Sequence, residues 1–142
     1  MVSFLNKEDK KKIVEAIRRA EKATSGEIRV HVKAKCKDDV MVEAKKVFDR
    51  LGMHRTHHRS SVLIFVALKS RRFAIIGDQG IHERVGDSFW NQTRDRMSDY
   101  FSKGQMQHGI VAGVNSVGEK LSKFFPHRLE DTNELSDQVT EG

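Results

Sequence analysis

The chain has 142 residues, of which 37% are hydrophobic and 32% are charged, and its formal net charge is +6. This length fits one domain, and no apolar run approaches the roughly 20 residues that a membrane-spanning helix needs. The amino terminus lacks the apolar stretch of a secretory signal, and the single cysteine, Cys36, excludes an internal disulfide, so we expect a cytoplasmic protein.

The positive charge is distributed unevenly along the chain. Residues 126–142 contain one arginine and five carboxylates, a net charge of −4, so residues 1–125 carry a net charge of +10. Such a chain can attract nucleic acid or anionic lipid, or let its acidic tail lie on its basic body. Because no nucleic-acid-binding motif is present, we interpret the charges as solvated faces and expect no nucleic-acid partner. We predict a domain over residues 1–125 and an acidic tail over residues 126–142.

The first elements along the chain are predicted to be a helix, a strand and a second helix. Asn6 is a suitable N-cap, and an apolar stripe at helical spacing predicts a helix over residues 7–23. Residues 27–34 alternate strictly between polar and apolar side chains, which predicts a strand with one wet face or at a sheet edge. Asp38 and Asp39 then begin a second helix, which Gly52 ends.

Cys36 lies between two lysines, Lys35 and Lys37, ahead of that second helix. Neighbouring cations can lower the pKa of a thiol. No partner base can be assigned from the sequence, so we interpret Cys36 as a free surface thiol without a catalytic role.

Residues 60–80 form the centre of the predicted fold. Val62 to Leu68 is a run of seven apolar residues, which is typical of a strand covered on both faces. The polar turn that follows is so short that the next strand, Phe73 to Ile76, must pair antiparallel with it. The strand at residues 27–34, the second helix and the buried strand form a βαβ unit, whose two strands are parallel. We therefore expect an α/β fold with a small mixed sheet.

The second half of the chain is predicted to be helical. A short helical turn is expected over residues 80–85, followed by a helix that Asp87 or Ser88 caps. The last helix runs from about Met106 to Phe124, where spaced glycines allow close approach to neighbours. The remaining residues are polar enough to stay loose unless they dock through their few apolar side chains, Leu129, Leu135 and Val139.

Three acidic residues are candidates for a metal site. The predicted topology places the start of the first strand, the start of the second and the end of the third at one edge of the sheet. Glu27, Asp78 and residues 59–61 can therefore converge there, and Asp87 can join them from the following helix. Carboxylate and carbonyl oxygens are the ligands of hard divalent cations such as calcium or magnesium. The alternative is that Asp78 forms an Asx-type turn and Asp87 caps a helix.

The segment between Gly52 and Ser60 is rich in histidine and arginine. Its spacing matches no common structural zinc site, so we interpret it as an exposed basic loop. Arg55 and Arg59 are candidates for contacting a phosphate or another acidic ligand, because a guanidinium presents a planar fork of donors to oxyanions.

The order of the segments TSGEIRV, VLIFVAL, RRFAIIGDQGI, GDSFWNQ and FSKGQMQHGIVAGV resembles the TPM domain family, which includes thylakoid and photosystem-associated proteins. The ending FPHRLEDTNELSDQ is similar to the short, soluble bacterial branch of that family. The resemblance implies a three-layer α/β/α sandwich with a mixed sheet. It also implies a divalent-metal site of acidic residues, usually assigned to calcium, and in some plant members a weak acid phosphatase activity. By motif it assigns Asp78 and Asp87 to the metal, and Glu27 is added on geometry.

These observations support two main hypotheses. The first is a divalent-cation-binding domain, for calcium or magnesium, that acts as an accessory module on a protein or membrane-associated partner. The second is a metal-assisted phosphatase, in which Glu27, Asp78 and Asp87 hold the metal and Arg55 and Arg59 face the phosphate. We rank the first hypothesis above the second because no nucleophile is apparent. Nucleic-acid binding ranks third, since only the bulk charge supports it.

Overall fold

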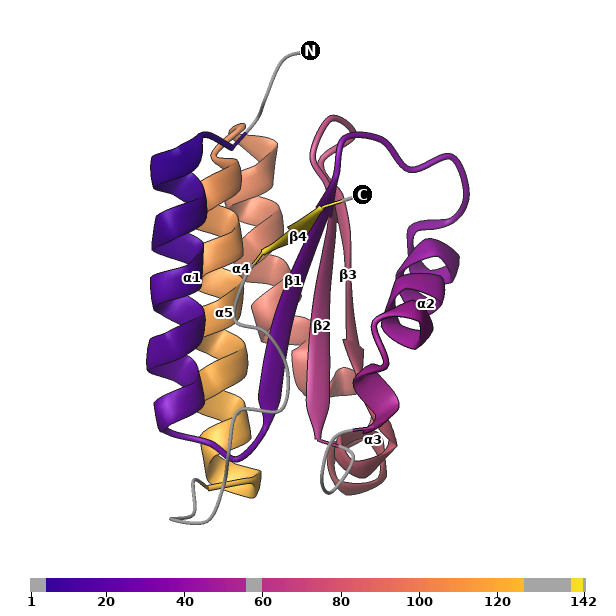
Figure 1. The fold of residues 1–142 in the computed structure, drawn as a ribbon, viewed down its shortest axis with the longest axis vertical. Coiled ribbons are helices and arrows are strands. Elements are labelled where there is room, and N and C mark those ends of the chain that lie inside the picture. Colours follow the sequence, from indigo (N-terminus) through magenta and orange to yellow (C-terminus); the bar gives the residue numbers. More distant parts are fainter. Residues whose placement is uncertain (1–4, 56–59, 127–138, 142) are drawn as a thin grey trace.

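The computed structural model describes residues 5–55, 60–126 and 139–141, which form three layers (Figure 1). The middle layer is a sheet with the strand order β3 (Arg72–Gly77), β2 (Ser61–Ala67), β1 (Glu27–Lys33) and β4 (Thr140–Glu141). One face is covered by α1 (Lys7–Lys22), α4 (Asn91–Ser102) and α5 (Met106–Phe124), and the other by α2 (Val40–Arg50). The predicted α/β/α sandwich with a mixed sheet is therefore confirmed.

Strand β2 is the centre of the sheet. It pairs parallel with β1, where Ile28 is opposite Val62, and antiparallel with β3, where Val62 is opposite Gly77. All of its residues are buried, as the continuous apolar run predicts. Alternate side chains of β2 enter two separate cores, so the strand needs a helical layer on each face.

The two cores differ in size and composition. The larger lies between the sheet and the helices α1, α4 and α5, and it includes Ile17, Ile64 and Val114. The smaller lies between the sheet and α2, and its members are Ala44, Val47, Phe48, Met53, Leu63, Phe65 and Ala74. None of the described helices is long and apolar enough to cross a membrane.

Helix α5 packs closely against its neighbours at all three of its glycines, Gly109, Gly113 and Gly118. A Cβ atom at Gly113 would lie 2.6 Å from the sulfur of Met97 on α4. A Cβ atom at Gly118 would lie 2.5 Å from the Cβ of Ala20 on α1. Because these distances are shorter than any van der Waals contact, the helices can approach this closely only where a side chain is missing.

The first strand differs from the prediction. Its polar face was expected to be wet, yet Glu27 is only 4% exposed and His31 only 2%. Strand β1 is also not at the sheet edge, because β4 pairs with it in parallel, with His31 opposite Thr140. Thr140 and Glu141 belong to the segment predicted as an acidic tail, whose neighbour Val139 packs against the larger core. The other two expected docking residues, Leu129 and Leu135, lie outside the described residues.

The start of α4 also differs from the prediction. A short 3-10 helix, η3 (Asp87–Trp90), precedes α4, and Trp90 occupies the N-cap position of α4 without a side-chain cap. Neither Asp87 nor Ser88 is therefore the N-cap of this helix. Gly86 supplies the turn into η3 with a φ of 75°, which favours glycine.

Replacing Gly118 by valine should lower the free energy of unfolding by about 1–3 kcal/mol, because the new side chain would overlap Ala20 and force α1 and α5 apart. Urea unfolding followed by circular dichroism would measure this change. Asn115→Ala, on the exposed side of the same helix, is the matched control. Equal stability of Gly118→Val and the wild type would show that the two helices are not in close contact at this position.

Candidate functional site

Glu27, Ser61 and Asp78 lie in one row across an end of the sheet, which we call the acidic edge. Glu27 is opposite Ser61 in the β1–β2 pair, and the backbone N–H of Asp78 donates to the carbonyl of Ser61 at 2.9 Å. Because neighbouring strands are about 4.8 Å apart, the Cα atoms of Glu27 and Asp78 are separated by about 10 Å. The structure thus brings these two residues to the same edge, while their role as metal ligands stays a prediction.

The three side chains of the acidic edge are on the face that α2 covers. Side chains alternate between faces along a strand. Leu63 belongs to the core beneath α2, so Ser61, two residues earlier, is on that face. Ile76 also packs against this core, so Asp78, two residues later, is on the same face. Glu27 is in register with Ser61, and both carboxylates therefore belong to one side of the sheet.

Both carboxylates of the acidic edge are withdrawn from solvent, since Glu27 and Asp78 are each 4% exposed. Asp78 is the N-cap of α3 (Gln79–Val85), and its Oδ1 accepts a hydrogen bond of 2.8 Å from the backbone N–H of Gln79. Asp78 therefore begins a helix, whereas the alternative interpretation of this residue was an Asx-type turn.

Small residues allow the strands to meet closely at the acidic edge. A Cβ atom at Gly26 would lie 3.0 Å from the carbonyl oxygen of Ser60 and 2.9 Å from Leu121. The hydroxyl of Ser61 donates to the carbonyl of Met53 at 2.6 Å. This bond ties the 3-10 helix η1 (Met53–Arg55) to the start of β2.

The other residues predicted for the site are described only in part. Asp87 is the first residue of η3 and Arg55 the last residue of η1, but the side chains of both lie outside the description, and Arg59 lies outside it altogether. Within residues 5–55, 60–126 and 139–141, no group of three or more His, Cys, Asp and Glu side chains is arranged to hold a metal ion. The donors of Glu27 and Asp78 fit a hard cation in kind, but calcium takes six to eight oxygens, so they supply part of a coordination shell.

His31 is a buried group that sequence reasoning missed. Its ring stacks on Phe65 with the centroids 5.8 Å apart, and its Nδ1 is 2.8 Å from the hydroxyl of Thr140. No described residue forms a hydrogen bond with its Nε2. The alternating pattern identified the strand but assigned His31 to a wet face, because the pattern carries no sign of the later strand that covers it.

Burial and, to a smaller extent, the cations Arg50, Lys33 and Arg29 lower the pKa of His31 from 6.5 to about 4, against the opposing effect of Glu141. The imidazole is therefore neutral at pH 7. Burial also lowers the pKa of Arg29. A neutral ring held in this way can accept a proton or a metal through Nε2, but among the described residues it belongs to no group of three or more possible metal ligands.

Cys36 is a poor candidate for a nucleophile. Burial raises the pKa of its thiol, which disfavours the reactive thiolate, although the flanking lysines suggested a lower value. The Sγ atom donates to the carbonyl of Asp38 at 3.1 Å.

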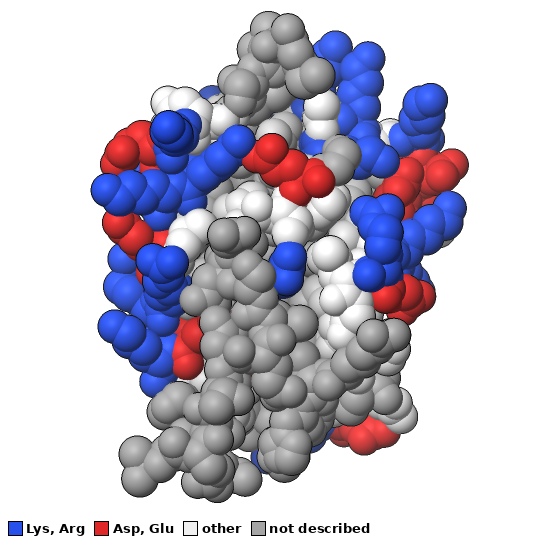
Figure 2. All heavy atoms as spheres, viewed as in Figure 1, with Lys and Arg blue, Asp and Glu red and all other residues white. Residues whose placement is uncertain are grey.

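Charged side chains are mixed over the face shown in Figure 2. Lysine and arginine side chains line the flank of α1 and surround α2, and carboxylates lie among them. A surface that binds nucleic acid usually concentrates positive charge in one patch or stripe. The mixture agrees with the interpretation of solvated faces, and the expected absence of a nucleic-acid partner stays a prediction.

Comparison with known proteins gives a consistent assignment. The family model described as the TPM domain matches residues 1–120. The solution structure of the BA42 protein from the psychrophilic bacterium Bizionia argentinensis is 42% identical, with a TM-score of 0.93 over 100% of this chain and 98% of that chain. No curated protein matches.

Two more distant solved structures share the fold. The N-terminal domain of a protein from P. gingivalis is 18% identical, with a TM-score of 0.74 over 89% of this chain and 83% of that chain. The N-terminal domain of the cg2496 protein from Corynebacterium glutamicum is 15% identical, with a TM-score of 0.66 over 82% of this chain and 74% of that chain.

His31→Phe should make the stability less sensitive to acid. The folded pKa of His31 is about 4 and the unfolded value 6.5, so the unfolded state binds more protons between these values. The contribution of His31 to stability is therefore complete above pH 6.5 and is lost as the pH falls toward 4. Urea unfolding at pH 7 and pH 5 would measure the difference, with the exposed His108→Gln as the control. If the two variants change that difference equally, His31 does not carry the effect.

Proposed function

The chain belongs to the TPM domain family, and from this premise we propose that it is a binding or accessory module that takes up a divalent cation of the calcium type at the acidic edge. Glu27 and Asp78 hold the cation in this proposal, with calcium preferred and magnesium as the second choice. The partner on which the module acts is a protein or a membrane-associated group.

The observation that carries the proposal is the placement of two buried carboxylates on one face of the sheet. Glu27 comes from the start of β1 and Asp78 from the end of β3, with only Ser61 between them in the row. A cation near carboxylates that are withdrawn from water offsets part of the cost of their desolvation. Both residues offer carboxylate oxygens, which are the donors that calcium prefers.

A bound cation supplies positive charge that can attract oxygen groups of a partner, such as carboxylates or phosphates. The chain's own contribution is to hold the two carboxylates at this edge. The β1–β2 register positions Glu27, and the capping hydrogen bond to Gln79 orients Asp78. Neither contact depends on the cation, so the fold positions both side chains before binding.

Glu27→Gln and Asp78→Asn should each weaken calcium binding by at least about tenfold, because each removes a charged ligand without changing the size of the side chain. Asparagine is as good an N-cap as aspartate, so Asp78→Asn preserves the start of α3. A calcium titration followed by amide chemical shifts and by calorimetry would measure the affinity. Glu15→Gln, at an exposed site on α1, is the matched control.

Two results would contradict the cation proposal. One is the absence of saturable shifts near residues 27 and 78 up to millimolar calcium. The other is an equal loss of affinity in Glu15→Gln and in the two edge variants, which would indicate diffuse attraction to a charged surface. A parallel titration with magnesium establishes which cation the edge prefers.

A second candidate function is metal-assisted hydrolysis of a phosphoester. It is favoured by one contact, the hydrogen bond from Ser61 to Met53, because this bond holds η1, and Arg55 at its end, beside the acidic edge. A metal there would polarise a phosphoryl oxygen, and the arginines Arg55 and Arg59 would hold the phosphate.

If the chain is a phosphatase, Asp78→Asn should lower kcat/KM for p-nitrophenyl phosphate by at least about tenfold in the presence of calcium or magnesium. The enzyme and the Glu15→Gln control would be purified in the same way and assayed together. A wild-type rate in Asp78→Asn would assign the activity to a contaminant and remove this candidate, while leaving the calcium titration unaffected.

A further inference from the structure

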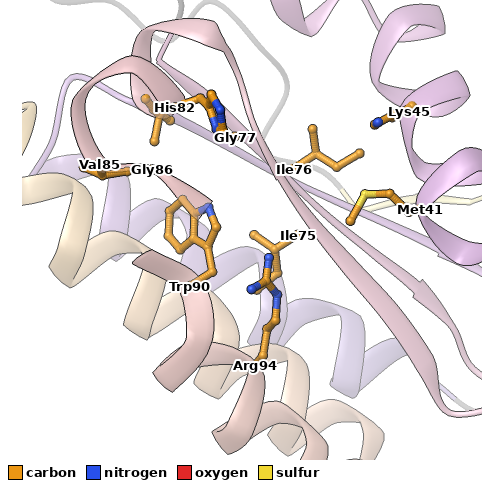
Figure 3. A pocket seen from close by; sticks show the side chains of 11 residues that line it. Met41, Lys45, Ile75, Ile76, Gly77, His82, Val85, Gly86, Trp90 and Arg94 are labelled. Carbon is orange, nitrogen blue, oxygen red and sulfur yellow. The ribbon is translucent and has the colours of Figure 1, made fainter. Parts of the chain in front are cut away.

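A cavity of about 280 Å³ lies beside the outer edge of β3 (Figure 3). Strand β3 is the last in the sheet order, so its outer side has no strand neighbour among the described residues. Helix α2 borders the cavity on one side, and α3, η3 and the start of α4 border it on the other. The cavity is thus built by four helical segments and a strand edge, and it is separate from the row formed by Glu27, Ser61 and Asp78.

The wall of the cavity is apolar and polar in about equal parts, and its apolar part comes from several elements. Met41 comes from α2, Ile75 from β3, Ile81 from α3 and Trp90 from η3, and Figure 3 shows the indole of Trp90 and the side chain of Met41 on opposite sides of β3. Ile75, Ile81 and Trp90 also belong to the larger core, so this wall is fixed by packing. This preformed apolar part of the wall suits the hydrocarbon part of a ligand.

Two cationic side chains, Lys45 and Arg94, line this cavity from opposite sides. Lys45 lies one helical turn after Met41 on α2, and Arg94 lies one turn after Trp90, so each shares a face with an apolar residue of the wall. Arg94 donates to the side chain of Asn91 at 3.1 Å, and neither cation forms an ion pair with a described carboxylate. None of the described residues that line the cavity is acidic.

The edge of β3 adds backbone donors to the cavity. The N–H of Asp78 bonds to Ser61, and bonded and non-bonded pairs alternate along an antiparallel ladder. Because Asp78 is bonded to β2, Ile76 is bonded to it as well, and the backbone groups of Gly77 and Ile75 point away from β2. Both residues line the cavity, so their backbone N–H and C=O groups, which do not pair with β2, border the same space as Lys45 and Arg94.

We propose that this cavity binds an amphipathic organic monoanion, an aliphatic or aromatic group of about six to ten carbons that ends in a carboxylate. The hydrocarbon part lies against Ile75, Ile81 and Trp90. The carboxylate lies at the mouth, where Lys45 and Arg94 provide charge complementarity. At about 30 Å³ per water molecule, the cavity has the volume of about nine waters, which matches a ligand of this size.

Octanoate is a suitable probe, and Trp90 is a suitable reporter because it is the only tryptophan in the chain. Octanoate should bind with a dissociation constant on the order of 1 mM or below, the range open to a ligand of about ten non-hydrogen atoms. Binding should change the fluorescence of Trp90 and shift the amide signals of Gly77 and Gly86. The titration is made with EDTA present, so its outcome is independent of any cation at the acidic edge.

The double variant Lys45→Gln/Arg94→Gln should weaken octanoate binding by at least about tenfold. Its matched control is Lys46→Gln/Arg96→Gln, which removes the same charge from exposed positions on the same two helices and should bind like the wild type. Octan-1-ol, which lacks the charge, should bind at least about tenfold more weakly than octanoate, and inorganic phosphate should leave the fluorescence of Trp90 unchanged.

Three results would overturn the proposal. They are the absence of saturable octanoate binding, an equal loss of binding in the two double variants, and equal responses to octanoate and octan-1-ol. A response to inorganic phosphate equal to that of octanoate would also overturn it, because the cavity would then be a simple anion site. The calcium titration at Glu27 and Asp78 can succeed or fail whatever the result here.

Discussion

The burial of β2 on both faces is the constraint on which the rest of the structure depends. Its backbone groups can be satisfied only by neighbouring strands, and β1 and β3 provide these hydrogen bonds on its two sides. Its alternating side chains require a core on each face, which explains why α2 lies opposite the bundle of α1, α4 and α5. The three layers thus follow from one apolar strand that no single helical layer could cover.

The register around β2 also creates the acidic edge. Because β1 runs parallel to β2 and β3 runs back, the start of two strands and the end of the third meet at the same place. A slip of one residue would move Glu27 to the opposite face from Asp78. The proposed cation site therefore depends on the same pairing that builds the sheet, and the close approach at Gly26 helps to hold that pairing in place.

The two sides of the sheet, at β1 and at β3, differ in what lies beside them. At β1, the short strand β4 adds a neighbour, and Thr140 contacts both His31 and the carbonyl of Val30. The salt bridge between Lys10 and Glu141 ties this strand to α1 as well. At β3, no strand among the described residues adds a neighbour, and the cations Lys45 and Arg94 lie beside this edge, an arrangement that discourages pairing with another sheet. The cavity that we assign to an organic anion uses these cations and the open backbone groups.

Much of this protein could be read from local patterns, because periodicity and turn length involve residues that are close in the chain. Local patterns predicted the helices that the structure has at residues 7–22, 40–50 and 106–124. They also predicted the hairpin of β2 and β3 and the parallel pairing of β1 with β2, and hence the placement of Glu27 and Asp78 at one edge of the sheet. The burial of Glu27 and His31 and the pairing of β4 with β1 are visible only in the folded chain. The same is true of the cavity that Lys45 and Arg94 both line. The bond between Thr140 and Val30, for example, joins residues 110 positions apart. Such contacts leave no local pattern, because the residues that form them lie far apart in the chain.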